Sequence, residues 1–300
     1  MAKYILSIDG GGMRGIMPAL ILAEVEKRCG KPVSEIFHLM AGTSTGGIVV
    51  AGLTVKGRHG PKYKAEDLAD LYRKHGPYIF KSSLLRRSMS WFNRAQYPHE
   101  NIETVLEEYF SDAKLKDSIT NVLLTSYDIH NNCPFFFKSW KEDRNSILVK
   151  DALRATTAAP TYFIPKSLKI HTTERVLVDG GVFANNPSAC AYATSKRLFP
   201  NDDIVILSLG TGRTDRRIEN ARKLGRIEWI MPLLDVVFAS GLDCVNYQMN
   251  KIMGDKYIRI QTQISAEMDD ATPESIRSLE EEAEAMIEKN QEAIARLCDV

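Results

Sequence analysis

A short stretch around Ser44 constrains the fold more than any other part of the chain. An apolar run leads into Gly-Thr-Ser-Thr-Gly at residues 42–46, and a second apolar run begins directly after it. This pattern predicts a strand, a sharp turn and a helix, with Ser44 at the apex of the turn. The Gly-x-Ser-x-Gly spacing is that of a nucleophile elbow, whose small neighbours let strand and helix pass closely and push the hydroxyl outward. The alternative is an ordinary glycine-rich turn.

The order of strands and helices around this elbow indicates the fold class. Residues 4–8 form a compact apolar strand, residues 16–29 have a helical pattern, and the strand and helix around Ser44 follow. Parallel strands need helical crossovers, so this alternation predicts an α/β fold with a mainly parallel central sheet flanked by helices. Further strands are expected over 121–129, 134–140, 175–178 and 203–209. Helices are expected over 65–75, 101–109, 147–159, 187–198, 229–238 and from 273 onward.

The length and the absence of an obvious linker predict one domain over residues 1–300, in which residues 213–300 form a helical C-terminal part. Hydrophobic residues make up 44% and charged residues 26% of the chain, as in ordinary soluble proteins. Lysine and arginine number 39 against 38 acidic residues, so the net charge of +1 gives no bulk attraction to nucleic acid.

The cysteines and the N-terminus predict a cytoplasmic protein. The odd count of five cysteines, with no CxxC pair, disfavours a disulfide framework and fits a reducing cytosol. The apolar run at the N-terminus is too short for a signal peptide. Residues 36–55 carry no formal charge, but four glycines, three threonines and a serine dilute them too far for a membrane span.

A glycine-rich loop at residues 9–15, Asp-Gly-Gly-Gly-Met-Arg-Gly, follows the first strand. It satisfies the dinucleotide pattern G-x-G-x-x-G, which makes an NAD-dependent Rossmann enzyme the rival interpretation. A Rossmann site needs an acidic residue at the end of the second strand. Glu35 has roughly the required spacing but precedes that strand, so the sequence disfavours nicotinamide chemistry.

The same loop can present backbone N–H groups to an anion such as a tetrahedral oxyanion. Donors from Gly11, Gly12 and Met13 would stabilise it by roughly 3 kcal/mol each. Arg14 would add a fixed positive charge or hold a phosphate, or else form a structural salt bridge with a carboxylate.

Ser44 needs a base, and the histidines do not provide a convincing one. An α/β-hydrolase triad places its histidine late in the chain, whereas the last histidine here, His171, lies in a polar stretch that resembles a solvated loop. Asp179 ends a buried strand directly before two glycines. We expect it at the same edge of a parallel sheet as Ser44, where burial would raise its basicity. The alternatives are that Asp179 merely ends a strand in an Asp-Gly turn, or that Asp9 is the base.

Taken together, the motifs at 9–15, 42–46 and 179–181 (Asp-Gly-Gly), with Ala-Thr-Thr-Ala-Ala-Pro at 155–160, resemble the patatin-like phospholipase family. The resemblance implies a three-layer sandwich, a Ser44–Asp179 dyad and hydrolysis of acyl lipids through an acyl-serine, as in phospholipase A or lysophospholipase. It implies no metal or cofactor. The oxyanion hole would come from the glycine loop, which contains Gly10, Gly11, Gly12, Met13, Arg14 and Gly15.

A lipid substrate implies contact with a membrane. Residues 78–94 mix aromatic and aliphatic side chains with arginines, as an interfacial segment does, although an ordinary surface helix has the same composition. The apolar segment 229–238 would line an acyl pocket, a core or a dimer seam. Resembling bacterial proteins include defence effectors that a cyclic nucleotide activates, which suggests a small-molecule nucleotide activator. A non-catalytic lipid- or nucleotide-binding protein of the same fold is the remaining alternative.

Overall fold

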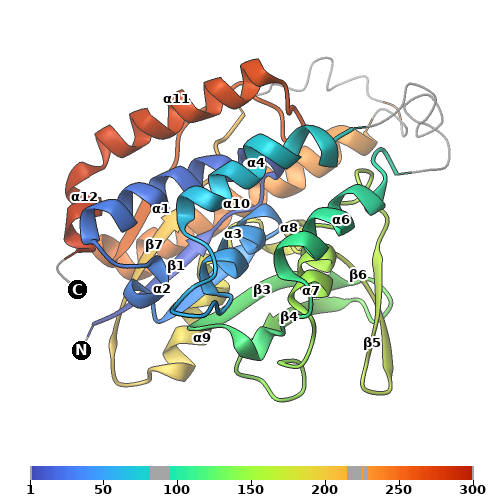
Figure 1. Cartoon of the computed structure of the whole chain (residues 1–300), viewed down its shortest axis with the longest axis horizontal. Helices are drawn as coiled ribbons and strands as arrows, with labels where there is room; N and C mark the ends of the chain where they lie inside the picture. The colour runs from blue at the N-terminus through green and yellow to red at the C-terminus, as the bar shows by residue number, and fades with distance from the viewer. Residues whose placement is uncertain (1, 82–94, 215–224, 226–228, 299–300) are drawn as a thin grey trace.

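The computed structural model describes residues 2–81, 95–214, 225 and 229–298. In this part of the chain a central sheet lies between two layers of helices (Figure 1). The predicted α/β class and the flanked, mainly parallel sheet are confirmed. The sheet has eight strands: β1 (Ala2–Ile8), β2 (Leu39–Thr43), β3 (Asn121–Asp128), β4 (Cys133–Lys138), β5 (Lys166–Ile170), β6 (Thr173–Asp179), β7 (Asp203–Leu209) and β8 (Tyr257–Ile260).

The helices follow the apolar patterns of the sequence, with some shifts at their ends. They are α1 (Ile16–Cys29), α2 (Val33–Ile36), α3 (Thr45–Thr54), α4 (Ala65–Ile79), α6 (His99–Phe110), α7 (Val149–Thr156), α8 (Gly181–Ala184), α9 (Ser188–Leu198), α10 (Ile230–Met253), α11 (Pro273–Lys289) and α12 (Gln291–Arg296). Short 3₁₀ turns cover Gly12–Gly15, Leu115–Asp117 and Gly254–Lys256.

Alternating side chains on the strands build a core on each face of the sheet. Leu6 and Ile8 of β1 pack with α1, α3, α4, α6, α7 and α11, whereas Ile5 packs on the other face with α9 and α10. Because helices cover both faces, the inner strands are apolar almost throughout, as the sequence shows. The parallel strands β3, β2, β1, β7 and β8 lie in this order across the sheet.

One strand departs from the parallel arrangement expected for it. β6 is antiparallel to β3, with Ser126 opposite Asp179. β4 pairs with residues 123–128 of β3, and both β2 and β6 pair with parts of that range. A strand has only two edges, so β2 and β6 share the edge opposite β4. They meet end to end, because Thr43 lies opposite Thr125 and Asp179 lies opposite the next residue of β3.

The C-terminal part adds to the same sheet. β8 pairs in parallel with β7, α10 packs against α8 and α9, and α11 packs along α1. The expected helix after Thr272 forms with that residue as its N-cap, but it ends at Lys289, and a second short helix follows. The single-domain organisation stays a prediction, and this shared sheet is the observation that supports it.

The cysteine expectation is wrong in one respect. Cys29, at the end of α1, forms a disulfide with Cys298, just after α12, whereas Cys133, Cys190 and Cys244 are free. An odd count excludes complete pairing but not a single bond between distant residues.

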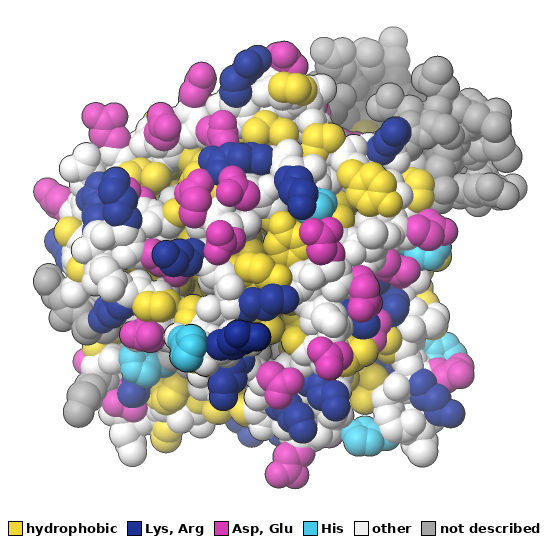
Figure 2. Space-filling model, viewed as in Figure 1, with side chains coloured by type: hydrophobic (Ala, Val, Ile, Leu, Met, Phe, Trp, Pro, Cys, Tyr) yellow, Lys and Arg dark blue, Asp and Glu magenta, His cyan; other side chains and the backbone are white. Residues whose placement is uncertain are grey.

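No helix in the described ranges is both long enough and apolar enough to cross a bilayer. The face seen in Figure 2 carries acidic and basic side chains interspersed with one another, with small hydrophobic areas between them.

Candidate active site

The turn after β2 has the strained geometry of a nucleophile elbow. Ser44 has φ 53° and ψ −121°, a positive φ that non-glycine residues adopt rarely. A Cβ at Gly42 would lie 2.4 Å from the carbonyl oxygen of Gly46, and a Cβ at Gly46 would lie 2.4 Å from that of Ile8. Both glycines are therefore required for the close passage of α3 over the ends of β1 and β2.

Threonines from three other elements hold this turn in place. The backbone N–H of Ser44 donates to Thr156 Oγ1 at 2.9 Å. Thr156 Oγ1 in turn donates to the carbonyl oxygen of Thr125 on β3. Thr43 Oγ1 lies 2.7 Å from Thr125 Oγ1 and donates to the carbonyl oxygen of Ala184 at 2.7 Å. The family-like block at 155–160 contains Thr156, but nothing in the sequence indicates the part that Thr125 has.

Asp179 reaches Ser44 because β6 ends where β2 ends. Asp179 lines the same cavity as Ser44, and the backbone N–H of Gly181 donates to Asp179 Oδ1 at 2.7 Å. Asp179 is 3% exposed. This burial raises its pKa to about 7, and the nearby Ser44 hydroxyl and the Gly181 N–H oppose the rise.

The other candidate bases lie elsewhere. His171 sits in the exposed turn between β5 and β6, where its Nε2 contacts the carbonyl oxygen of Asp143. Asp9 is buried and forms an ion pair with Arg259 of β8. Glu35 is exposed on α2, ahead of β2, so the acidic residue of a Rossmann site is not at the strand end that would need it.

Most backbone groups of the glycine loop already have partners. The N–H of Gly10 donates to the Asn185 carbonyl oxygen at 3.0 Å, and that of Met13 donates to the Met268 carbonyl oxygen at 2.8 Å. The N–H of Arg14 donates to the Gly11 carbonyl oxygen. Met13 is therefore unavailable as the donor that the sequence suggested.

Two N–H groups of the loop, those of Gly11 and Gly12, make no hydrogen bond within the described part of the chain, and both residues line the same cavity as Ser44. Gly12 has φ +59°, and a Cβ there would lie 2.1 Å from the Met268 carbonyl oxygen. A side chain at this position would therefore displace the loop.

Arg14 and Gly15 are buried residues whose contacts hold the loop and the elbow together. The Arg14 side chain is buried, and its Nε donates to the Gly11 carbonyl oxygen at 3.2 Å. Burial lowers the pKa of Arg14 to about 10, against the attraction of nearby carboxylates, of which Glu267 has the largest effect. A Cβ at Gly15 would lie 2.2 Å from Thr45 Oγ1, so this glycine permits close packing beneath the elbow.

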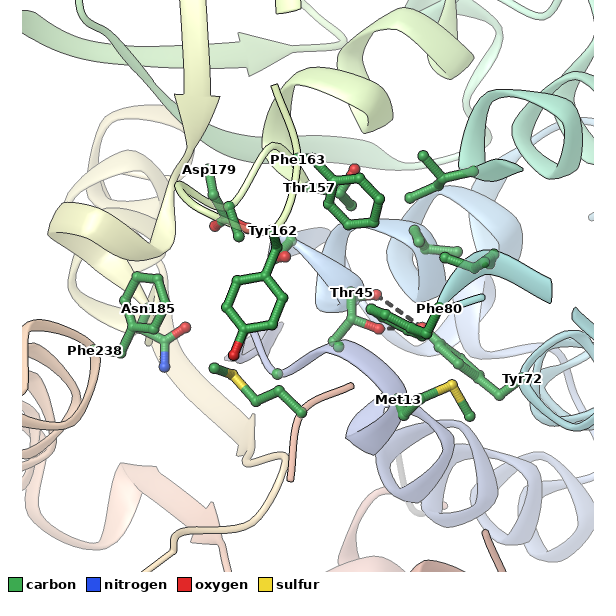
Figure 3. A pocket seen from close by; sticks show the side chains of 18 of the residues that line it. Met13, Thr45, Tyr72, Phe80, Thr157, Tyr162, Phe163, Asp179, Asn185 and Phe238 are labelled. Atoms are coloured by element: carbon green, nitrogen blue, oxygen red, sulfur yellow. Dashed lines mark hydrogen bonds between the residues drawn. The ribbon is translucent and has the colours of Figure 1, made fainter. Parts of the chain in front are cut away.

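A mostly apolar cavity opens beside Ser44 and Asp179. Its empty space, counted together with the open solvent at its mouth, is about 720 Å³. Figure 3 shows Asp179, Asn185 and Phe238 on one side, with Thr45, Phe80, Tyr72 and Met13 on the other and Tyr162 between them. Ile48, Leu71, Ile79, Ile102 and Phe163 supply further apolar wall.

The C-terminal part contributes residues that the sequence did not reveal. Phe238 of α10 and Met268 line the cavity, and Arg259 holds Asp9 at the start of the glycine loop. The segment expected at 229–238 thus reaches the pocket through Phe238, while Leu233 and Val236 are exposed. No local pattern marks these residues, because each meets its partner only across the folded sheet. The core of the expected interfacial segment, residues 82–94, lies outside the described residues.

Comparisons with known proteins agree with this geometry. The sequence model of the family described as patatin-like phospholipase matches residues 6–191. The chain is 31% identical to patatin-like protein 1 of Arabidopsis thaliana, with 94% of this chain and 81% of that protein covered. It is 29% identical to patatin-15 of Solanum tuberosum, with 95% and 83% covered.

A solved structure shares the fold. VipD from Legionella pneumophila superposes with a TM-score of 0.53 at 11% identity, over 99% of this chain and 66% of that one. The sequence match, the elbow and the shared fold lead to one conclusion: the chain belongs to the patatin-like phospholipase family of lipid acyl hydrolases.

Proposed function

We propose that Ser44 and Asp179 form a catalytic dyad that cleaves fatty-acyl esters of phospholipids or lysophospholipids. The observation that carries this proposal is that the strained Ser44 and the buried Asp179 meet at the wall of one apolar cavity. A carboxyl whose pKa lies near 7 can hold a proton and release it at neutral pH, as a general base must.

The reaction has two steps. Asp179 accepts the proton of the Ser44 hydroxyl while Oγ bonds to the ester carbonyl carbon; the ester C–O bond then breaks, and the leaving alcohol takes the proton from Asp179. Water, deprotonated by Asp179, attacks the acyl carbon of the acyl-serine; the bond between that carbon and Ser44 Oγ breaks, Oγ takes the proton back from Asp179, and the fatty acid leaves. Gly11 and Gly12 line the cavity, and their N–H groups, which make no hydrogen bond within the described residues, would stabilise the oxyanion in both steps.

Lipid-product mass spectrometry with paired variants tests the dyad. Ser44→Ala and Asp179→Asn should each lower product formation by at least a thousandfold while leaving the protein folded. Ser34→Ala is the matched control, because Ser34 is also buried but lies outside the cavity. Full activity in either dyad variant would contradict the proposal.

Two alternatives have their own readouts. A non-catalytic binding protein would leave Ser44 unlabelled by a serine-directed fluorophosphonate. An NAD-dependent enzyme would gain thermal stability in the presence of NAD, whereas the proposed hydrolase would not.

We further propose that the cavity mouth contacts a lipid surface. Exposed apolar residues occur within two positions in the sequence of aromatic residues that line the cavity: Tyr78 before Phe80, Ile164 after Phe163, and Val236 before Phe238. Lipid chains would cover this apolar surface as they enter the pocket.

Flotation with phosphatidylcholine vesicles tests this contact. Leu233→Ser combined with Val236→Ser should lower vesicle binding severalfold and leave hydrolysis of a water-soluble ester unchanged. Ile119→Ser is the control, since Ile119 is 40% exposed and lies at the opposite end of β3, outside the cavity. Equal binding by wild type and the double variant would remove the proposal.

Activation, assembly and compartment are proposed from the family resemblance and the sequence. Unchanged activity across a panel of cyclic dinucleotides would contradict activation by a cyclic nucleotide. A monomeric mass in light scattering would contradict a homo-oligomer. A cytoplasmic location requires Cys29 and Cys298 to be reduced in the cell, whereas their disulfide favours an oxidising compartment. Alkylation of thiols before lysis, followed by mass spectrometry, separates the two.

A further inference from the structure

Asp9, the residue just before the glycine loop, is a buried carboxylate with one dominant partner. It is 0% exposed, and the guanidinium of Arg259 contacts both of its oxygens, with Nη1 donating to Oδ1 at 2.9 Å and Nη2 donating to Oδ2. This two-point contact fixes the orientation of the carboxylate as well as its charge. Neither residue takes part in the proton transfers proposed above.

Arg259 reaches Asp9 across three neighbouring strands. On β8 it lies opposite Ser208 of β7, and Ser208 lies opposite Ser7 of β1. Arg259 Nη1 also donates to Ser208 Oγ at 2.7 Å. Ser188 Oγ lies within hydrogen-bond distance of both Ser7 Oγ and Ser208 Oγ, at 2.9 and 3.0 Å. The guanidinium is thus itself held by a buried polar network.

This network acts on the part of the loop that carries the two free N–H groups. Beyond Asp9, the Gly10 N–H donates to Asn185 and the Gly10 carbonyl oxygen accepts from Thr211 Oγ1 at 2.6 Å. These contacts fix the chain up to Gly10, and the next two residues, Gly11 and Gly12, line the cavity. A shift of Asp9 would therefore turn both donors.

We propose that Arg259 is a positioning residue for the oxyanion-binding loop: its contact with Asp9 aims the N–H groups of Gly11 and Gly12 and neutralises a carboxylate beside the site where negative charge develops. The inference rests on the proposed function, because it needs the loop to bind an oxyanion. It assigns to β8, which lies beyond the family match at residues 6–191, a role in the reaction.

Kinetics on a water-soluble short-chain ester test the proposal without involving membrane contact. Arg259→Met should lower kcat about a hundredfold, the loss typical of one oxyanion donor, with KM within about threefold of the wild type. Arg259→Lys keeps the charge and the fold but loses the two-point contact, and should lower kcat about tenfold. Combining Asp9→Asn with Arg259→Met removes the unpaired charge and should restore kcat about tenfold over Arg259→Met alone.

Arg175→Met is the matched control. Arg175 also pairs with a fully buried aspartate, Asp128, at 2.8 Å, but it lies on the middle of β6 and outside the cavity. Its loss should lower the melting temperature and leave kcat within about threefold of the wild type.

Equal kcat in Arg259→Lys and wild type, or equal losses in Arg259→Met and Arg175→Met, would overturn the inference and show a purely structural pair. These outcomes differ from failure of the proposed function, in which the wild type itself would show no hydrolysis that Ser44→Ala abolishes. If Arg259→Met does not fold, the comparison of Arg259→Lys with wild type decides.

Discussion

Asp179 shows how position changes the chemistry of a common side chain. An exposed aspartate has a pKa of about 3.9 and is too weak a base to accept a hydroxyl proton at neutral pH. Here burial raises the pKa to about 7, and the nearby Ser44 hydroxyl and the Gly181 N–H only partly oppose this effect.

The raised pKa predicts the pH dependence of catalysis. The base must be deprotonated, so kcat/KM on a soluble ester should rise with pH through about 7 and level off above it. A pH–rate profile between pH 5 and 9, measured over the stable range of the enzyme, checks this. A profile that is flat from pH 5 to 7 would contradict Asp179 as the base.

Stability should respond to pH with the opposite sign. Because the folded pKa lies above the unfolded value of about 3.9, the folded state binds more protons than the unfolded state between these values. The contribution of Asp179 to stability is therefore fully present below pH 4 and is lost as pH rises through about 7. Melting temperatures of wild type and Asp179→Asn should accordingly move in favour of the variant between pH 5 and pH 8.

At the scale of elements, the site depends on two strands whose C-terminal ends meet along one edge of a third strand. β2 and β6 share one edge of β3, so Ser44 and Asp179 face each other over the junction between Thr125 and Ser126. If β6 ran parallel to β3 on this edge, its C-terminal residue Asp179 would lie at the end of β6 that points away from β2. The helices α3 and α7 then fix the turn from above, the latter through Thr156.

Thr156→Val tests this support. The change removes the acceptor for the Ser44 N–H and leaves that buried donor unpaired, which costs about 1–3 kcal/mol of unfolding free energy. We expect kcat to fall between tenfold and a hundredfold as the elbow relaxes. Thr54→Val is the control, because Thr54 is equally buried but only donates to carbonyl oxygens of its own helix, α3. Similar kcat values in the two variants would show that Thr156 does not hold the nucleophile.

At the scale of the whole molecule, the C-terminal part completes a site that the first 181 residues begin. It supplies β8 with Arg259, the cavity residues Phe238 and Met268, and α11 against α1. The disulfide between Cys29 and Cys298 joins the end of this part to α1 and closes a loop of 269 residues. The bond thereby links the segment just after α12 to the C-terminal end of α1.

Reduction of this disulfide should destabilise the protein. A cross-link over so long a loop contributes about 3 kcal/mol, so Cys29→Ser or a strong reductant should lower the melting temperature by about 5 °C or more. Cys244→Ser, at an exposed free cysteine, should have no such effect. An unchanged melting temperature in reductant would show that the bond does not stabilise the fold.

The sequence by itself determined the features that are local. The turn at Ser44 needs glycines two residues away on each side, the loop at 9–15 needs glycines to bring backbone close to its neighbours, and alternating apolar runs specify strands and helices. Each of these follows from steric limits or periodicity within a few residues. The α/β class and the positions of most strands could therefore be predicted.

Only the tertiary structure decided which distant groups meet. β6 runs antiparallel to β3 and brings Asp179 opposite Ser126, 53 positions earlier in the chain. Arg259 pairs with Asp9 over 250 positions, and Cys29 bonds to Cys298 over 269 positions. Strand register and burial select these partners, and no local pattern encodes them. For the same reason the sequence could suggest Met13 as a donor, whereas the fold gives its N–H to Met268 and leaves Gly11 and Gly12 free beside Ser44.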